Sequence, residues 1–218
     1  MYFLSIMSKP TKPSFEVEVR GKITEQFKTL LTRFRKIATF VGEKDRFSLI
    51  YFNHGLVKDV REIKDEKIDL RLRITNKKSE LILKYGAWGG SDSREEHSLP
   101  VPREKFWDTA LLLQRLGWTN GVVLATRTYV FQYQGIEFAL VQNKHLNYFE
   151  AEKMVANKKD IAKERAAILA ICQSLQLQPF SDEAFMDALN IINNRPENQF
   201  DFTKQSFEEI KKRYKEFF

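Results

Sequence analysis

Two pairs of glutamates, each with one residue between its members, occur far apart in this chain. They are Glu16 with Glu18 near the start, and Glu150 with Glu152 well past the middle. Each pair lies in an extended, strand-like stretch, where period-two spacing puts both carboxylates on the same face. A single pair of this kind is most simply the solvent-facing side of a strand, because antiparallel sheets commonly have one wet face.

Basic residues follow a similar pattern on the stretches between the two acidic pairs. They are Arg71 and Arg73 in one apolar stretch, Lys84 in the next and Arg127 in a later one. Exposed strand faces usually mix both signs of charge, whereas here separate strands carry one sign each. Charges arranged in this way on apolar strands predict a charged interior, which proteins rarely keep for stability alone.

A closed sheet would direct these side chains into one lumen. Four carboxylates grouped at one end would repel each other strongly unless a divalent cation lay among them. Guanidinium and ammonium groups further along would bind phosphate oxygens, and arginine can do so in bidentate fashion. Hard oxygen ligands for Mg²⁺ or Mn²⁺, followed by fixed cations, are what a linear polyphosphate chain needs.

The elements that would position these residues are strands first and helices later. Alternation predicts a strand over residues 15–22, and apolar residues at helical spacing predict a helix over residues 24–41. Further strands are predicted over residues 46–52, 70–75, 80–85, 93–101, 121–126, 127–134, 136–142 and 146–152. Further helices are predicted over residues 102–117, 160–177 and 204–218. Another helix is predicted to begin after Ser181, which would be its N-cap. Mostly neighbouring antiparallel strands fit a barrel or a strongly curled sheet with helices outside.

Composition limits the possible classes of protein without choosing among them. The 218 residues are 43% hydrophobic, which is enough to fill a real core, and the net charge of +7 favours an anionic partner. The single cysteine, Cys172, excludes an internal disulfide framework and a cysteine-rich zinc site. No stretch approaches the roughly 20 apolar residues of a membrane span. We expect residues 1–14 to be a leader segment and the protein to be cytoplasmic.

The order of the charged motifs resembles that of the CYTH domain, also called the triphosphate tunnel metalloenzymes. This family includes class IV adenylate cyclases, thiamine triphosphatases and inorganic triphosphatases. The resemblance covers roughly residues 15–175. The matching motifs are Glu16-Val-Glu-Val-Arg20, Leu70-Arg-Leu-Arg73, Leu81-Ile-Leu-Lys84, Arg94-Glu-Glu96, Arg127 within Ala125-Thr-Arg-Thr-Tyr129, and Tyr148-Phe-Glu-Ala-Glu152.

The resemblance implies an α+β fold, in which an eight-stranded antiparallel β-barrel, or tunnel, is flanked by helices. Residues 15–218 would form one domain, including a helical C-terminal region from about residue 160. The resemblance implies that Mg²⁺ or Mn²⁺ and the catalytic centre are held by Glu16, Glu18, Glu150 and Glu152. It implies that the triphosphate path is lined by Arg20, Arg71, Arg73, Lys84, Arg94 and Arg127. Catalysis would rest on positioning and charge neutralisation, with the metal activating the attacking oxygen.

Three positions depart from the pattern of the family. Arg20 stands where the family usually has lysine, and Ala125 stands where many members have lysine. The family usually offers an aspartate near Gln142, where this chain has no acid and Glu137 is the nearest one. Such departures could mean an altered choice of substrate, weaker metal binding or lost catalysis.

The first functional hypothesis is a divalent-metal-dependent hydrolase of a nucleoside, thiamine or inorganic triphosphate. One alternative is a class IV-type adenylate cyclase that makes cyclic AMP and pyrophosphate, but the chain lacks a His-Phe pair just before its first acidic pair. Another is an inactive module that binds polyphosphate or a nucleotide, as Ala125 and Gln142 suggest. The last is a structural scaffold with surface charges.

The partner that these hypotheses share is a small-molecule triphosphate or polyphosphate. A nucleic-acid surface is disfavoured because no aromatic residues are interleaved with the basic ones. A membrane partner is not expected. We expect a monomer or a homodimer.

Overall fold

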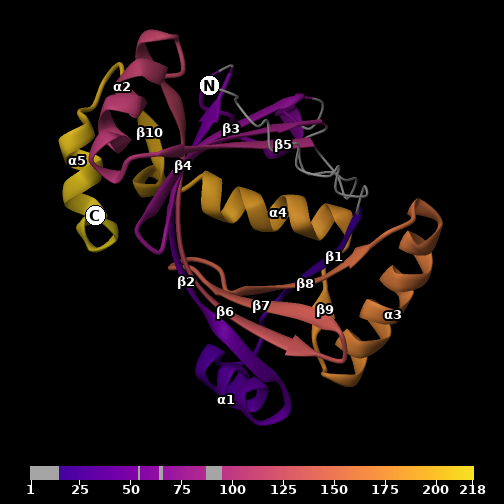
Figure 1. Ribbon diagram of the computed structural model, residues 1–218. Coiled ribbons are helices and arrows are strands. Elements are labelled where there is room, and N and C mark those ends of the chain that lie inside the picture. Colours follow the sequence, from indigo (N-terminus) through magenta and orange to yellow (C-terminus); the bar gives the residue numbers. More distant parts are fainter. Residues whose placement is uncertain (1–14, 54, 64–65, 87–94) are drawn as a thin grey trace, which may run out of the picture.

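The computed structural model describes residues 15–53, 55–63, 66–86 and 95–218 (Figure 1). In these residues, ten strands form one antiparallel sheet that curves strongly around a central space. The predicted leader, residues 1–14, lies outside the described part of the chain.

The strand order in the sheet is β5-β4-β3-β2-β6-β7-β8-β1-β9, and β10 pairs with β6. The strands are β1 (Phe15–Lys22), β2 (Thr39–Phe52), β3 (Ile68–Thr75), β4 (Lys78–Tyr85), β5 (Glu95–Val101), β6 (Asn120–Tyr133), β7 (Ile136–Gln142), β8 (Tyr148–Val155), β9 (Gln178–Pro179) and β10 (Gln199–Asp201). This order brings β1 and β8 together although they are far apart in the chain.

The predicted fold class, a curved antiparallel sheet flanked by helices, is confirmed, but the sheet is open, so the expected closure into an eight-stranded barrel is corrected. In the described residues, β5 and β9 lie at the two ends of the strand order and do not pair with each other. The free edge of β1 is partly covered by β9, which pairs at Gly21 and Lys22. Pro179 has no N–H to donate, so this short strand cannot extend the ladder toward β5.

The long pair β2 and β6 forms the middle of the sheet. Its register runs from Thr39 opposite Gln132 to Phe52 opposite Asn120. The prediction of two strands over residues 121–134 is therefore wrong, because pairing with β2 continues through this region. The prediction that the first helix reaches residue 41 is also wrong, because Ala38 is already extended and the next residues pair with β6.

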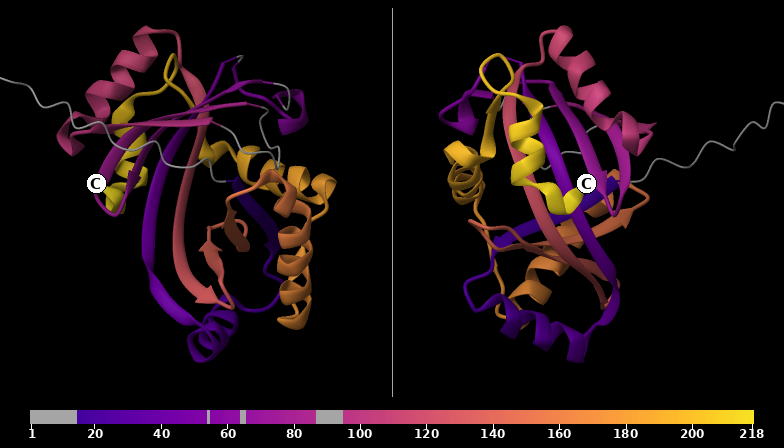
Figure 2. Two further views of the ribbon diagram at one scale, coloured as in Figure 1. Left: turned by 45° about the vertical axis from the view of Figure 1, so that its right-hand side comes forward. Right: turned by 90° about the vertical axis from the view of Figure 1, so that its left-hand side faces the viewer.

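In the described residues, α1, α2, α3 and α5 pack on the outside of the curved sheet, and α4 lies across its concave side (Figures 1 and 2). The helices are α1 (Phe27–Ile37), α2 (Phe106–Arg115), α3 (Ile161–Ser174), α4 (Asp182–Asn193) and α5 (Phe207–Arg213). Short 3-10 turns are η1 (Val60–Ile63), η2 (Arg103–Lys105), η3 (Lys158–Asp160), η4 (Pro196–Asn198) and η5 (Lys215–Phe217). The predicted N-cap is confirmed, since the Ser181 hydroxyl accepts the Ala184 N–H at 3.2 Å. Every helix in these ranges is too short or too polar to cross a lipid bilayer.

The two largest apolar cores lie between the convex face of the sheet and the outer helices. In one, Phe34 of α1 contacts the rings of Phe131 and Phe138. In the other, Phe47 of β2 contacts Phe106 of α2. Because successive strand residues point to opposite faces, this packing turns the alternate residues of the same strands toward the concave side.

Candidate functional site

The concave side of the sheet encloses a cavity of about 460 Å³ with a strongly charged lining. Six acidic and six basic side chains line it, and the two signs balance. They are Glu16, Glu18, Arg20, Lys44, Arg46, Arg71, Arg73, Lys84, Glu96, Glu137, Glu150 and Glu152.

One half of the cavity, which we name the acidic wall, consists of β1, β7 and β8. Its carboxylates are Glu16, Glu18, Glu137, Glu150 and Glu152. Glu18 lies opposite Glu152, and Glu152 in turn lies opposite Glu137. Because residues opposite each other on paired strands share a face, the two predicted glutamate pairs come together in one group.

The other half, which we name the basic wall, consists of β2, β3 and β4. Its cations are Lys44, Arg46, Arg71, Arg73 and Lys84. Between the two walls, β6 contributes only neutral side chains, namely Leu124, Thr126 and Thr128. The strand order of the sheet therefore separates most charges of the cavity into two opposed surfaces, and the exceptions are Arg20 on β1 and Glu96 on β5.

Burial, together with crowding of carboxyls, favours protonated carboxyls on the acidic wall. Burial raises the pKa of Glu18 to about 7 although the Arg20 guanidinium opposes this shift, and Glu150 and Glu16 raise it further. Burial also raises the pKa of Glu152 to about 8, and a hydrogen bond with Glu16 adds to the effect. A cation placed among these carboxyls would remove the repulsion.

The donor set of the acidic wall fits a hard divalent cation, because Mg²⁺ and Mn²⁺ prefer carboxylate oxygens. In the described ranges, however, no three acidic, histidine or cysteine side chains are already arranged around a point that could hold a metal. Arg20 contacts two of these carboxylates, since its Nη2 lies 2.5 Å from Glu18 Oε2 and its Nε lies 3.5 Å from Glu150 Oε1. Metal binding between these two carboxylates therefore requires the guanidinium to move.

Three of the predicted cations on the basic wall are held by carboxylates. Arg71 donates two hydrogen bonds to Asp69, at 2.7 and 2.6 Å, and the pair is largely shielded from solvent. Arg73 donates two hydrogen bonds to Glu80 Oε1, at 3.0 and 2.9 Å. Lys84 Nζ lies 2.8 Å from a carboxylate oxygen of β5. These contacts fix the orientation of the cations.

Arg46 differs from its neighbours because no described carboxylate lies within ion-pair distance of it, although Glu150 attracts it from further away. Among the described residues no carboxylate lies within 4.0 Å of its guanidinium, and its buried Nε has no hydrogen-bond partner. Burial lowers the pKa of Arg46, and the positive charge of Arg73 lowers it further. The cavity thus contains a partly buried cation that is free to pair with an anion.

Arg127 does not line the cavity, so its predicted place on the phosphate path is corrected. Its side chain is 54% exposed, and its Nε lies 2.7 Å from Asp45 Oδ1. The physical reason is the alternation of β6: Thr126 and Thr128 face the cavity, so the residue between them faces outward. Arg94, also predicted to bind phosphate, lies outside the described residues.

Two of the three departures from the family pattern also lie away from the cavity. Gln142 pairs with Arg127 across β6 and β7 and so shares its outward face, and Ala125 has the same parity on β6. Neither residue is part of the cavity lining. The third departure, Arg20, does line the cavity and is the one that bears on its chemistry.

Sequence reasoning missed two cations of β2, Lys44 and Arg46. The expected strand began at residue 46, so the alternation that unites the two residues was cut off. Arg46 lies opposite Thr126 in the observed register, and the two share the cavity face. The alternation of Lys44, Arg46 and Ser48 was the signal that could have found them.

Comparison with known proteins agrees with this architecture. A CYTH domain family model matches residues 14–185. Two proteins of Pyrococcus horikoshii resemble the chain with TM-scores of 0.58 and 0.60 at 17% and 19% identity. The alignments cover 78% and 80% of this chain and 98% and 97% of theirs. Among curated proteins, none is similar enough in sequence to count as a match.

Two further solved structures have the same fold. A proposed adenylate cyclase of Vibrio parahaemolyticus has a TM-score of 0.55 at 16% identity, covering 90% of this chain and 97% of its own. A proposed adenylyl cyclase of Hippeastrum with a dominant triphosphatase activity has a TM-score of 0.51 at 12% identity, covering 81% and 96%. At such identities the likeness concerns the fold alone, but the family model spans most of the sequence. The chain therefore belongs to the CYTH domain family.

Proposed function

We propose that this protein is a divalent-metal-dependent hydrolase that cleaves a triphosphate compound bound in the charged cavity. Proteins of the CYTH family act on triphosphates, as triphosphatases or as adenylate cyclases. The observation that carries the proposal is Arg46, a partly buried cation with no described carboxylate within ion-pair distance, among fixed cations of the basic wall.

The basic wall suits a chain of phosphate groups. A guanidinium has five N–H donors, and the carboxylates that hold Arg71 and Arg73 use two on each. The remaining donors, with those of Arg46, can bind phosphate oxygens in fixed directions. Prepositioned donors of this kind stabilise charge that develops during phosphoryl transfer, because they need no reorganisation when the reaction occurs.

The acidic wall would repel the same phosphate chain unless a cation neutralised it. The residues that would hold Mg²⁺ or Mn²⁺ are Glu16, Glu18, Glu150 and Glu152. A bound metal would supply a Lewis acid for the phosphate oxygens and lower the pKa of a coordinated water. Arg20 would balance the carboxylates when the cation is absent, since its guanidinium contacts two of them.

Hydrolysis ranks ahead of cyclisation and of binding without turnover. The Hippeastrum protein is described as a proposed cyclase with a dominant triphosphatase activity, which supports this order. The case for an inactive module rested on Ala125 and Gln142, and both lie outside the cavity lining. The cytoplasmic location and the oligomeric state, monomer or homodimer, stay predictions.

The test is a thermal-shift screen followed by product analysis. Each assay contains one of three compounds, namely tripolyphosphate, thiamine triphosphate or ATP. Each compound is tested with Mg²⁺, with Mn²⁺ and with a chelator. We expect metal-dependent release of phosphate from at least one of them, lost in Glu18→Gln and retained in the exposed control Glu183→Gln. Cyclic AMP with pyrophosphate would decide for the cyclase, and no turnover of any triphosphate would refute the proposed function.

A further inference from the structure

We propose that an apolar chamber beside the charged cavity binds the organic part of the substrate. The substrate would then be a triphosphate ester of a group about the size of one six-membered ring, rather than inorganic tripolyphosphate or a purine nucleotide. This inference rests on the proposed function and adds the class of substrate to it.

The chamber has a volume of about 140 Å³ and lies between the concave face of the sheet and α4. The sheet contributes Ile50, Val122 and Leu124, and the helix contributes Ala188, Leu189 and Ile192. An engineered cavity of about 150 Å³ with similar apolar walls binds benzene. The chamber is therefore large enough for a single ring and too small for a purine with its ribose.

The chamber adjoins the charged cavity. Five residues line both spaces, namely Arg20, Arg71, Leu124, Tyr148 and Glu150. A molecule whose phosphates lie along the basic wall can therefore place in the chamber the organic group that is esterified to one end of its phosphate chain. An inorganic phosphate chain carries no apolar group that would gain from burial against the apolar walls of the chamber.

Arg20 marks the junction of the two spaces. On the side of the cavity its guanidinium contacts Glu18, and on the side of the chamber it lies over the ring of Phe185, at 5.0 Å from the centroid. Phe180 lies next to Phe185, with ring centroids 6.1 Å apart, and both line the chamber. Two aromatic rings beside Arg20 favour an organic group that is flat and apolar.

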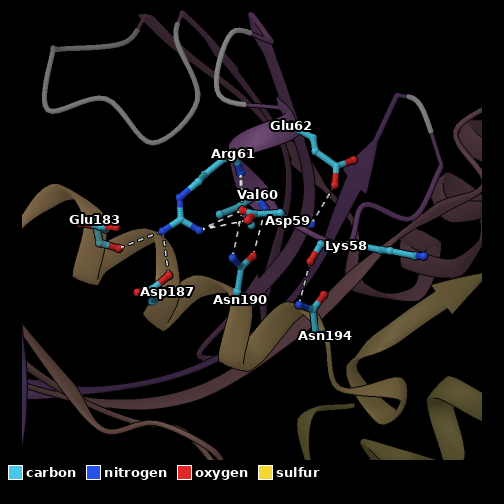
Figure 3. Close-up of polar contacts among 9 residues, drawn as sticks. All are labelled: Lys58, Asp59, Val60, Arg61, Glu62, Glu183, Asp187, Asn190 and Asn194. Atoms are coloured by element: carbon cyan, nitrogen blue, oxygen red, sulfur yellow. Dashed lines mark hydrogen bonds and ion pairs between the residues drawn. The ribbon is translucent and has the colours of Figure 1, made fainter.

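The wall formed by α4 is fastened to the rest of the molecule by a group of polar contacts that we name the α4 clasp (Figure 3). Arg61 contacts Asp187 of α4 at 2.7 Å and Asp59 at 3.0 Å. Asn190 of α4 accepts the N–H of buried Val60 at 2.9 Å and donates to Asp59 Oδ1 at 3.0 Å. A wall held at several points keeps the size of the chamber fixed, as selection by size requires.

The experiment compares probes that resist hydrolysis because methylene groups bridge their phosphorus atoms. Calorimetry measures the affinities of the methyl ester, the benzyl ester and the adenosine ester of such a bridged triphosphate. The methyl ester carries the same charge as the benzyl ester and controls for it. We expect the benzyl ester to bind about tenfold more tightly than the methyl ester, from burial of the ring, and the adenosine ester to show no such gain.

Variants of α4 test the effect of a smaller chamber and of a larger one. Ala188→Leu fills it and should bring the benzyl-to-methyl ratio close to one, whereas Ile192→Ala enlarges it and should improve binding of the adenosine ester. Ala184→Leu, on the same helix but outside the chamber lining, should keep the wild-type ratio. Circular dichroism establishes that each variant is folded.

Two outcomes would overturn the inference and can be told apart. If the methyl ester binds and the benzyl ester binds no better, the chamber is not an organic subsite although the proposed function stands. If no bridged triphosphate binds in the presence of Mg²⁺, the proposed function fails as well.

Discussion

Replacing Arg46 by methionine should make the unliganded protein more stable and should lower its affinity for triphosphate. The guanidinium has no carboxylate partner among the described residues, and its Nε is buried without a hydrogen bond. Burial and the charge of Arg73 lower the pKa of Arg46, so the fold disfavours the charged form. Methionine keeps an unbranched stem on β2 and removes the charge.

The size of both effects follows from this environment. A buried donor left unsatisfied costs about 1–3 kcal/mol, and water in the cavity reduces that cost, so we expect a gain of about 1 kcal/mol. For a chain of this length such a gain raises the melting temperature by about 2–4 °C. A hydrogen bond to a charged group contributes about 1.5–3 kcal/mol, so binding of triphosphate should weaken about 10- to 100-fold.

The assay is thermal denaturation with and without a bridged tripolyphosphate that resists hydrolysis. Ligand at about 100 times the wild-type Kd stabilises the wild type by about 2.7 kcal/mol and the variant by much less, so the order of the melting temperatures should invert. Arg73→Met is the matched control, because it deprives Glu80 of its counter-ion and should lower stability without ligand. A lower melting point for unliganded Arg46→Met, or an unchanged shift with ligand, would refute the reasoning.

Three further predictions concern the acidic wall, the α4 clasp and the sheet. Burial and neighbouring glutamates raise the pKa of Glu152 to about 8. The contribution of this protonated carboxyl to stability is therefore present at pH 4 and is lost as the pH rises through about 8. The melting temperature, measured from pH 5 to 9, should fall less steeply for Glu152→Gln than for the wild type. Asn190→Ala leaves a buried backbone N–H unpaired and should lower the free energy of unfolding in urea by about 1–3 kcal/mol. Asn194→Ala removes an exposed hydrogen bond at the end of the same helix and should lower it by about 0.5 kcal/mol. A Cβ at Gly121 would lie 2.0 Å from a carbonyl oxygen of β2, whereas one at Gly42 meets nothing within 4 Å, so only Gly121→Ala should lower the melting temperature. A steeper pH dependence for Glu152→Gln, or equal effects within either matched pair, would contradict the contacts behind these predictions.

Local patterns were sufficient where one face of an element is apolar and the other polar. The predicted strand over residues 15–22 is β1, and the predicted strand over residues 136–142 is β7. In β1, Val17 and Val19 enter the core on the convex side, while Glu16 and Glu18, which alternate with them, face the cavity. The hydroxyl of Ser181 caps α4 because short-range hydrogen bonding alone decides that position.

Long-range pairing decided what local patterns could not. Phe40 and Val41 continue the helical spacing of the preceding residues, yet they are 45% and 57% exposed and belong to β2. Their conformation comes from pairing with β6, which no window of sequence contains. The same pairing keeps β6 continuous, and a continuous β6 puts Arg127 outside and Thr126 inside.

The net charge of the chain, +7, is not located in the cavity, where six acidic and six basic side chains balance. Attraction for a phosphate chain must therefore come from the separation of charge rather than from its sum. That separation is a property of strand order: β2, β3 and β4 are neighbours, β7, β8 and β1 are neighbours, and the neutral lining of β6 lies between them. Along the sequence, the first acidic pair precedes all these cations and the second follows them, so only folding brings the two pairs together. In the proposed function, the basic wall would attract the phosphate chain and a cation would neutralise the acidic wall, so a triphosphate and a divalent metal would suit the cavity better together than either would alone.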